Sequence, residues 1–159
     1  IRYLKIFTFL PFERIAELEE QVKTTPEKRE AQKVLAEELT RCVHGEKGLE
    51  SAVRASAVFF GGSLEGLTAE ELEVIFKEVH SATLAKADVL GKPVFELAAL
   101  AGFMSSKGEA RRLAQQGGLS LNNTKADPAR VVEANDLIGE RMLLLRSGKK
   151  SYFLVKVEK

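Results

Sequence analysis

The chain has 159 residues, 45% of them hydrophobic and 30% charged, a composition typical of a folded globular protein rather than a disordered one. No stretch approaches the roughly 20 consecutive apolar residues of a membrane-spanning helix, so we expect no membrane partner. The only cysteine, Cys42, excludes an internal disulfide and a cysteine-cluster metal site, and it favours a reducing compartment. Because Ile1 stands where an initiator Met is usual, we expect a fragment of a longer protein.

Charge is unevenly distributed along the chain, although the net charge is only +1. Residues 1–92 contain 13 Lys and Arg against 16 Asp and Glu, a net charge of −3. Residues 93–159 contain 11 against 7, a net charge of +4. A basic excess in one part of a chain indicates an anionic partner, of which nucleic acid is the commonest.

The first part of the chain, residues 1–82, predicts a helical domain. After Pro11, apolar residues recur at the spacing of a helix. Thr25 as a cap and Pro26 at the first helical position predict the start of a second helix. Gly45 ends that helix, since glycine adopts the left-handed conformation of a helix end at little cost.

Two more helices are expected before the chain changes character. An apolar stripe over residues 49–60 predicts a third helix that is mostly buried, and Thr68 with Glu71 fits a capping box that begins a fourth. Regular periodicity is lost over residues 83–92, so we expect a linker there.

The second part, residues 93–159, predicts a small α+β domain. Two short helices come first, the second opened by Ser106 and ended by Gly117 and Gly118. Short runs typical of strands follow: LSLN, VVEAN, MLLLR and SYFLVKV. The last two runs form a hairpin with a basic tip. The predicted fold class is therefore α+β, a helical domain followed by two short helices and a small antiparallel sheet.

Basic and amide side chains gather in this second domain. Lys107 and Arg111 are four residues apart and share one helix face, with Arg112 beside them. Such donors suit phosphate oxygens, although a merely solvated helix face would look the same. The candidate phosphate-binding residues are Lys107, Arg111, Arg112, Asn122, Lys125, Arg146, Lys149 and Lys150.

The same segment resembles the S-four type RNA-binding domain, which occurs in many RNA-handling proteins. The resemblance rests on an ordered series of residues: Ser106, Ala110, Arg111, Arg112, Leu113, Gly117, Gly118, Leu119, Leu121, Asn122, Lys125, Asp127 and Pro128.

Upstream segments resemble the anticodon-binding region of bacterial and mitochondrial tyrosyl-tRNA synthetases, which an S-four type domain follows. They are RYLKIFTFL, REAQKVLAEELTRCVHG, GLESAVRAS and FFGGSL, and RMLLLRSGKKSYFLVKVE resembles the C-terminal hairpin of the same enzymes. The resemblance implies that residues 1–82 bind the anticodon end of tRNA(Tyr). It implies that residues 93–159 bind the anticodon stem and the variable arm.

The resemblance also implies a tyrosine–tRNA ligase of class I, whose catalytic domain uses ATP and Mg. The His-Ile-Gly-His-like and Lys-Met-Ser-Lys-Ser signatures of that domain do not occur here, so we expect this chain to be non-catalytic and to hold no cofactor. We expect a homodimer through the catalytic domain and a monomer for this chain alone. The expected location is the cytoplasm for a bacterial source, and the mitochondrial matrix or chloroplast stroma for an organellar one.

Three side chains in the first domain admit more than one interpretation. His44 contacts RNA or interacts with the last carbonyl groups of its helix, where a cation is favourable. Phe7 and Phe9 stack on bases, or belong to the core or to the seam with the catalytic domain.

Two other functions fit the same sequence. In one, the S-four type domain serves a different RNA-modifying or ribosome-associated protein, and the helical part binds a protein. In the second alternative, the chain is a structural interaction domain whose basic residues only confer solubility.

Overall fold

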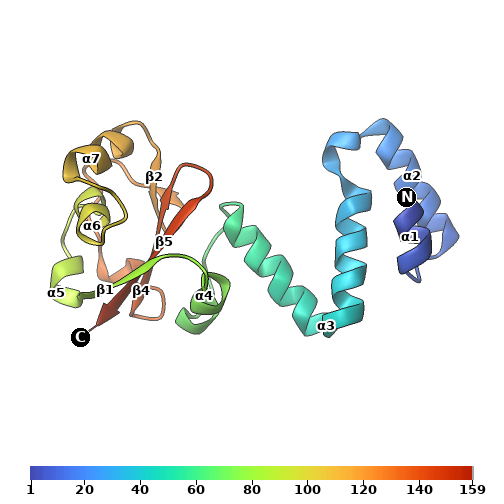
Figure 1. The fold of residues 1–159 in the computed structure, drawn as a ribbon, viewed down its shortest axis with the longest axis horizontal. Helices are drawn as coiled ribbons and strands as arrows, with labels where there is room; N and C mark the ends of the chain where they lie inside the picture. Colours follow the sequence, from blue (N-terminus) through green and yellow to red (C-terminus); the bar gives the residue numbers. More distant parts are fainter. Residues whose placement is uncertain (159) are drawn as a thin grey trace. The chain divides into compact units, whose positions relative to one another are not determined.

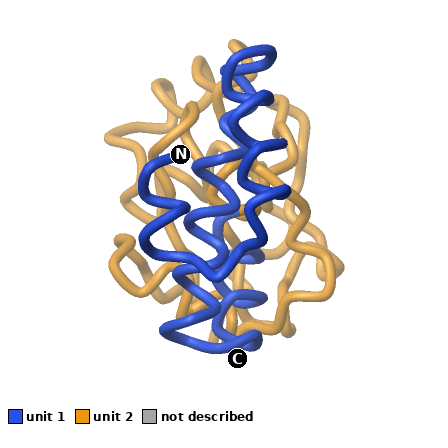
Figure 2. The backbone as a smooth tube through the Cα atoms, turned by 90° about the vertical axis from the view of Figure 1, so that its right-hand side faces the viewer, with its two compact units in different colours: residues 1–56 blue, residues 57–159 orange. Residues whose placement is uncertain are grey.

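The computed structural model describes residues 1–158 and divides into two compact units, residues 1–56 and 57–159 (Figures 1 and 2). The predicted linker at residues 83–92 is therefore not where the chain divides. Within residues 1–158, no helix combines the length and apolarity needed to cross a membrane.

The first unit is helical, as predicted. Its elements are α1 (Arg2–Phe7), α2 (Phe12–Thr24), η1 (Pro26–Lys28) and the larger part of α3 (Glu30–Phe59). A small core forms where Leu4, Ile15, Leu18 and Ala31 pack together. Gly45 interrupts α3 with φ 72° and ψ −177°, so the predicted helix end is confirmed, but another helical segment follows without a loop.

Two expectations for these helices are wrong. The second helix does not begin at Pro26, because Arg29 adopts a left-handed conformation (φ 55°) and separates the short η1 from α3. Residues 49–60 are not mostly buried: Leu49 and Val58 are, while Phe60 is 87% exposed.

The second unit is a five-stranded sheet with helices, which confirms the α+β class. The strands follow the order β1-β5-β4-β2-β3. All pairings are antiparallel except that of β1 with β5, which is parallel, so the expected purely antiparallel sheet is corrected at that edge. The elements are α4 (Ala69–Ile75), β1 (Ser81–Ala85), α5 (Lys86–Val89), α6 (Val94–Leu100), α7 (Lys107–Gln115), β2 (Leu119–Leu121), β3 (Thr124–Lys125), η2 (Ala134–Asp136), β4 (Met142–Ser147) and β5 (Ser151–Glu158).

One predicted strand is absent from the sheet. The run VVEAN, residues 131–135, contributes a single bridge between Val131 and Pro93 and then enters η2. In contrast, the hairpin of β4 and β5 is confirmed, with residues paired from Met142 and Lys156 to Ser147 and Ser151.

Both faces of the β4–β5 hairpin are buried. Successive strand residues point to opposite faces of a sheet, and here both sets of side chains belong to a hydrophobic cluster. One face packs under α6 and α7, and the other packs under residues 58–76, as the two hydrophobic clusters show. Figure 1 shows α6 and α7 together on one side of the sheet. The first face presents Leu143, Leu145, Phe153 and Val155, and the second presents Met142, Leu144, Tyr152 and Leu154.

This two-sided burial explains the position of the boundary. Leu72 and Phe76, expected in the helical domain, are fully buried against the sheet. The expected linker contains the end of β1 and α5, whose Val89 is also fully buried. The segment 57–92 therefore belongs to the sheet unit.

We expect a chain of residues 57–159 to unfold cooperatively on heating, and a chain of residues 93–159 to fail to fold. The shorter chain lacks β1 and leaves Leu144 and Leu154 uncovered, and an exposed large apolar patch is unfavourable in water. Circular dichroism and calorimetry on both chains measure this. A cooperative transition in the shorter chain would contradict the boundary at residue 57.

Candidate nucleic-acid interface

Helix α7 presents its predicted cations to solvent. The Ser106 hydroxyl caps the helix by accepting a hydrogen bond from the Glu109 amide at 3.2 Å. Ala110 is fully buried, which turns the exposed side chains of Arg111 and Arg112 outward. The helix thus forms as predicted, with its small residues inward and its cations outward.

Two of the three α7 cations interact with their own protein. Lys107 Nζ lies 2.8 Å from Glu96 Oε2, and the Arg111 guanidinium carbon lies 6.0 Å from the centroid of the Phe95 ring. Hydrogen bonds from the Ser105 side chain and amide lower the pKa of Glu109, with a smaller contribution from Arg112. Within residues 1–158 Arg112 itself forms no ion pair, so it is the least committed of the three.

A second basic group lies across the sheet on the face opposite α7. Lys125 of β3 pairs with Ser120 of β2, Ser120 pairs with Arg146 of β4, and Arg146 pairs with Tyr152 of β5. Directly opposed residues of antiparallel strands share a face. The predicted residues Lys125 and Arg146 therefore lie in one cross-strand row with Tyr152.

The tip of the β4–β5 hairpin adds two lysines beside Arg146. The turn uses Gly148 at φ 60°, and the Gly148 amide donates to the Gly118 carbonyl oxygen at 2.8 Å, which ties the tip to the turn after α7. Lys149 and Lys150 are exposed, and the described residues offer neither of them an ion pair. Arg146, Lys149 and Lys150 line one hollow, whereas Lys107 lies at the far end of α7.

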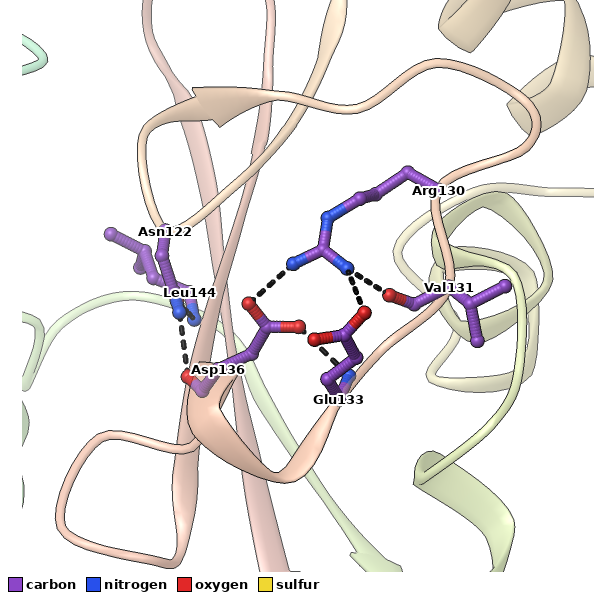
Figure 3. A network of polar contacts seen from close by, with 6 residues as sticks. All are labelled: Asn122, Arg130, Val131, Glu133, Asp136 and Leu144. Atoms are coloured by element: carbon purple, nitrogen blue, oxygen red, sulfur yellow. Dashed lines mark hydrogen bonds and ion pairs between the residues drawn. The ribbon is translucent and has the colours of Figure 1, made fainter.

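Asn122, by contrast, is used internally. Its Nδ2 donates to the Asp136 carbonyl oxygen at 2.7 Å, and its Oδ1 accepts from the Leu144 amide at 2.9 Å (Figure 3). Figure 3 also shows Arg130 holding the Asp136 carboxylate, with Nη2 to Oδ1 at 2.6 Å. We therefore remove Asn122 from the phosphate-binding set, because its amide fastens the loop after β3 to β4.

The neighbouring Asn123 completes a tight turn and holds a distant segment. Asn122 and Asn123 have φ of 49° and 63°, which suits the two-residue turn between β2 and β3, where asparagine is favoured. Asn123 Nδ2 donates to the carbonyl oxygens of Val58 and Gly62 at 2.9 and 3.0 Å. The segment that carries Phe59 and Phe60 is thereby fixed to the sheet.

Sequence reasoning missed these aromatic residues as part of the interface. Phe59, Phe60 and Tyr152 line the same hollow as the hairpin cations. No local signal could have found them, because bonds from Asn123 and Tyr152, both distant in sequence, hold the segment that carries Phe59 and Phe60.

The candidate residues of the first unit are exposed. His44 is exposed, and no hydrogen bond of its side chain is found in the part of the chain that the structure describes. Phe7 and Phe9 are 55% and 98% exposed, so their assignment to the core is wrong. Base stacking and an interdomain seam remain predictions for them.

Comparison with known families follows the two units. Residues 1–61 match the family of class I tRNA synthetases for tryptophan and tyrosine, described as "tRNA synthetases class I (W and Y)". Residues 71–155, more than half of the chain, match the tyrosine–tRNA ligase SYY-like C-terminal domain. The chain therefore belongs to the tyrosine–tRNA ligase C-terminal domain family.

Individual relatives agree with this assignment. The chain is 43% identical over 157 residues to tyrosine–tRNA ligase of Geobacillus stearothermophilus, covering 98% of this chain and 37% of the relative. It is 44% identical over 156 residues to tyrosine–tRNA ligase 1 of Bacillus licheniformis, with coverage of 98% and 37%. The chain thus spans little more than a third of these relatives.

A solved structure is also similar to part of the chain. It is a solution structure of a tyrosyl-tRNA synthetase C-terminal domain, with 32% identity and a TM-score of 0.47. The match covers 61% of this chain and 96% of that domain.

We expect Asn123→Gly to destabilise the second unit by about 1–3 kcal/mol, because two carbonyl oxygens in part-buried hydrogen bonds lose their donor. Glycine adopts the left-handed backbone without steric cost, and the Asn135→Gly control accounts for the extra conformational entropy that glycine loses on folding. Urea unfolding measures it, with Asn135→Gly at an exposed position as the control. Equal stabilities for the two variants would show that Asn123 does not hold the segment 58–62.

Proposed function

We propose that this chain binds tRNA(Tyr) as the C-terminal part of a tyrosine–tRNA ligase. Family membership and the printed names of the relatives support the proposal. The observation that carries it is the group of cations at one end of the sheet, Lys125, Arg146, Lys149 and Lys150, for which the described residues provide no carboxylate partner. A surface of unpaired cations fits a polyanion.

Phosphate contacts supply the binding in this proposal. Each cation that neutralises a phosphate releases condensed counterions, so affinity falls as the salt concentration rises. Folded RNA hides most base edges in its deep major groove and offers backbone and 2′-hydroxyls instead. A rigid basic surface that recognises the shape of the anticodon stem and the variable arm suits these accessible features.

The chemistry of tyrosine attachment belongs to residues outside this chain. We infer that ATP, with Mg, and tyrosine bind there, and that the whole enzyme is a homodimer through that part. In the described residues, no group of three or more His, Cys, Asp or Glu side chains is placed to hold a metal ion. The location follows the source, cytoplasm for a bacterium and matrix or stroma for an organelle.

We expect Lys149→Ala plus Lys150→Ala to weaken binding of tRNA(Tyr) and to lower the slope of log affinity against log salt. Each lost phosphate contact removes about 0.7–0.9 from that slope. Filter binding across a salt series measures it, with a non-cognate tRNA as competitor. Lys77→Ala plus Lys86→Ala is the control, since both lysines are exposed in the same unit and the charge removed is equal. Equal effects of the two pairs would mean that only net charge matters.

We expect Arg111→Ala plus Arg112→Ala to weaken binding more than the change at Lys149 and Lys150. An arginine fork spans two phosphate oxygens, whereas lysine acts as a flexible point charge. The contact of Arg111 with Phe95 also orders this side chain before binding. The same salt series tests this. If the variant binds tRNA(Tyr) with the same affinity and the same salt slope as the unchanged chain, the basic face of α7 is merely solvated.

A further inference from the structure

A hollow of about 510 Å³ lies beside the hairpin tip, entirely within the second unit. Aromatic and basic side chains share its lining. They are Phe59, Phe60, Arg146, Lys149, Lys150 and Tyr152. No carboxylate contributes to this lining, so the hollow is both aromatic and positively charged.

The aromatic wall of the hollow is held in place before any ligand arrives. Tyr152 Oη donates to the Phe59 carbonyl oxygen at 2.7 Å, and the two rings meet edge to face with centroids 5.6 Å apart. Phe59 also packs on the buried Phe76, at 4.8 Å between centroids. With the Asn123 bonds to residues 58 and 62, these contacts fix the backbone that carries Phe60.

Phe60 is the unusual member of the group. Its side chain is 87% exposed, although its neighbour Val58 is buried and the segment is tied to the sheet. An exposed phenylalanine on a fixed backbone presents a ring face to solvent at little further cost in conformational entropy. The ring is therefore available to a planar ligand.

Arg146 is one of the three cations that line the hollow. Its guanidinium carbon lies 5.3 Å from the Tyr152 centroid, and Nη2 donates to the Lys149 carbonyl oxygen at 3.3 Å. Its buried Nε has no hydrogen-bond partner among the described residues. The guanidinium also passes close to Gly61, where a Cβ atom would come within 2.7 Å of Nη1. Glycine at that position leaves room for the arginine.

We propose that this hollow binds one unpaired nucleotide of an RNA, with the base stacked on Phe60 and the phosphate held by Arg146, Lys149 and Lys150. The proposal rests on the proposed function, and it adds a site that phosphate binding alone does not require. Single-stranded RNA is recognised by stacking of splayed-out bases on aromatic rings beside cations that follow the backbone. A paired base has both faces covered by its neighbours, so a duplex does not satisfy this site.

A tryptophan reporter tests the stacking directly. The chain contains no Trp, so Phe60→Trp introduces a single one at the hollow. Val74→Trp is the control, since Val74 is 75% exposed on α4 of the same unit and does not line the hollow. We expect single-stranded RNA to quench the fluorescence of Phe60→Trp, with little quenching by a duplex of equal length or in Val74→Trp. Equal quenching at both positions, or quenching by an acidic peptide rather than RNA, overturns the proposal.

Affinity measurements separate stacking from charge. We expect Phe60→Ala to weaken binding of single-stranded RNA about tenfold, Phe60→Tyr to restore it, and Val74→Ala to have no effect. The salt slope should stay unchanged in Phe60→Ala because no cation is removed. If the original chain binds tRNA(Tyr) and Phe60→Ala binds RNA equally well, the nucleotide site is refuted and the proposed function stands. If the original chain binds no tRNA, the proposed function itself fails, and this proposal fails with it.

Discussion

Burial of both faces of the β4–β5 hairpin is the constraint on which the rest of the second unit depends. A strand pair that is apolar on both sides needs a layer on each, and two separate parts of the chain provide them. Helices α6 and α7 cover one face, and the segment from Val58 to Phe76 covers the other. The basic residues Arg146, Lys149 and Lys150 lie at the end of β4 and in the turn that follows it, at the edge of these layers.

The layers also position the side chains that face solvent. The buried side chains of Ala110 and Ala114 pack α7 against the sheet, so Arg111 and Arg112 point toward solvent. On the opposite face, the rings of Tyr152 and Phe76 pack with their centroids 5.3 Å apart, and the Tyr152 hydroxyl donates to the Phe59 carbonyl oxygen. These contacts place Phe60 at the edge of the layer that covers this face. The same elements thus supply both buried core side chains and side chains that face solvent.

The sequence predicted the elements of this fold better than their grouping. The capping box of Thr68 and Glu71, the Ser106 cap and the β4–β5 hairpin follow from local signals, and all three form. The boundary between the units does not follow from local signals. The helical spacing of Leu72 and Phe76 is the same whether their helix packs in a helical bundle or against a sheet. A clue was present in MLLLR, which lacks the alternation of a strand with one solvated face.

The candidate site was only partly predictable for a related reason. Charge and spacing identify Lys125, Arg146, Lys149 and Lys150, since Lys and Arg side chains are almost never fully buried. Asn122 matched the same pattern, but its left-handed backbone and two internal bonds make it a turn residue. Phe60 is held beside the hairpin by the Tyr152 bond to Phe59 and by the Asn123 bonds to residues 58 and 62, and all of these bonds join residues distant in sequence. No local pattern encodes these contacts, so the aromatic half of the hollow emerges only once the sheet and its second layer are assembled.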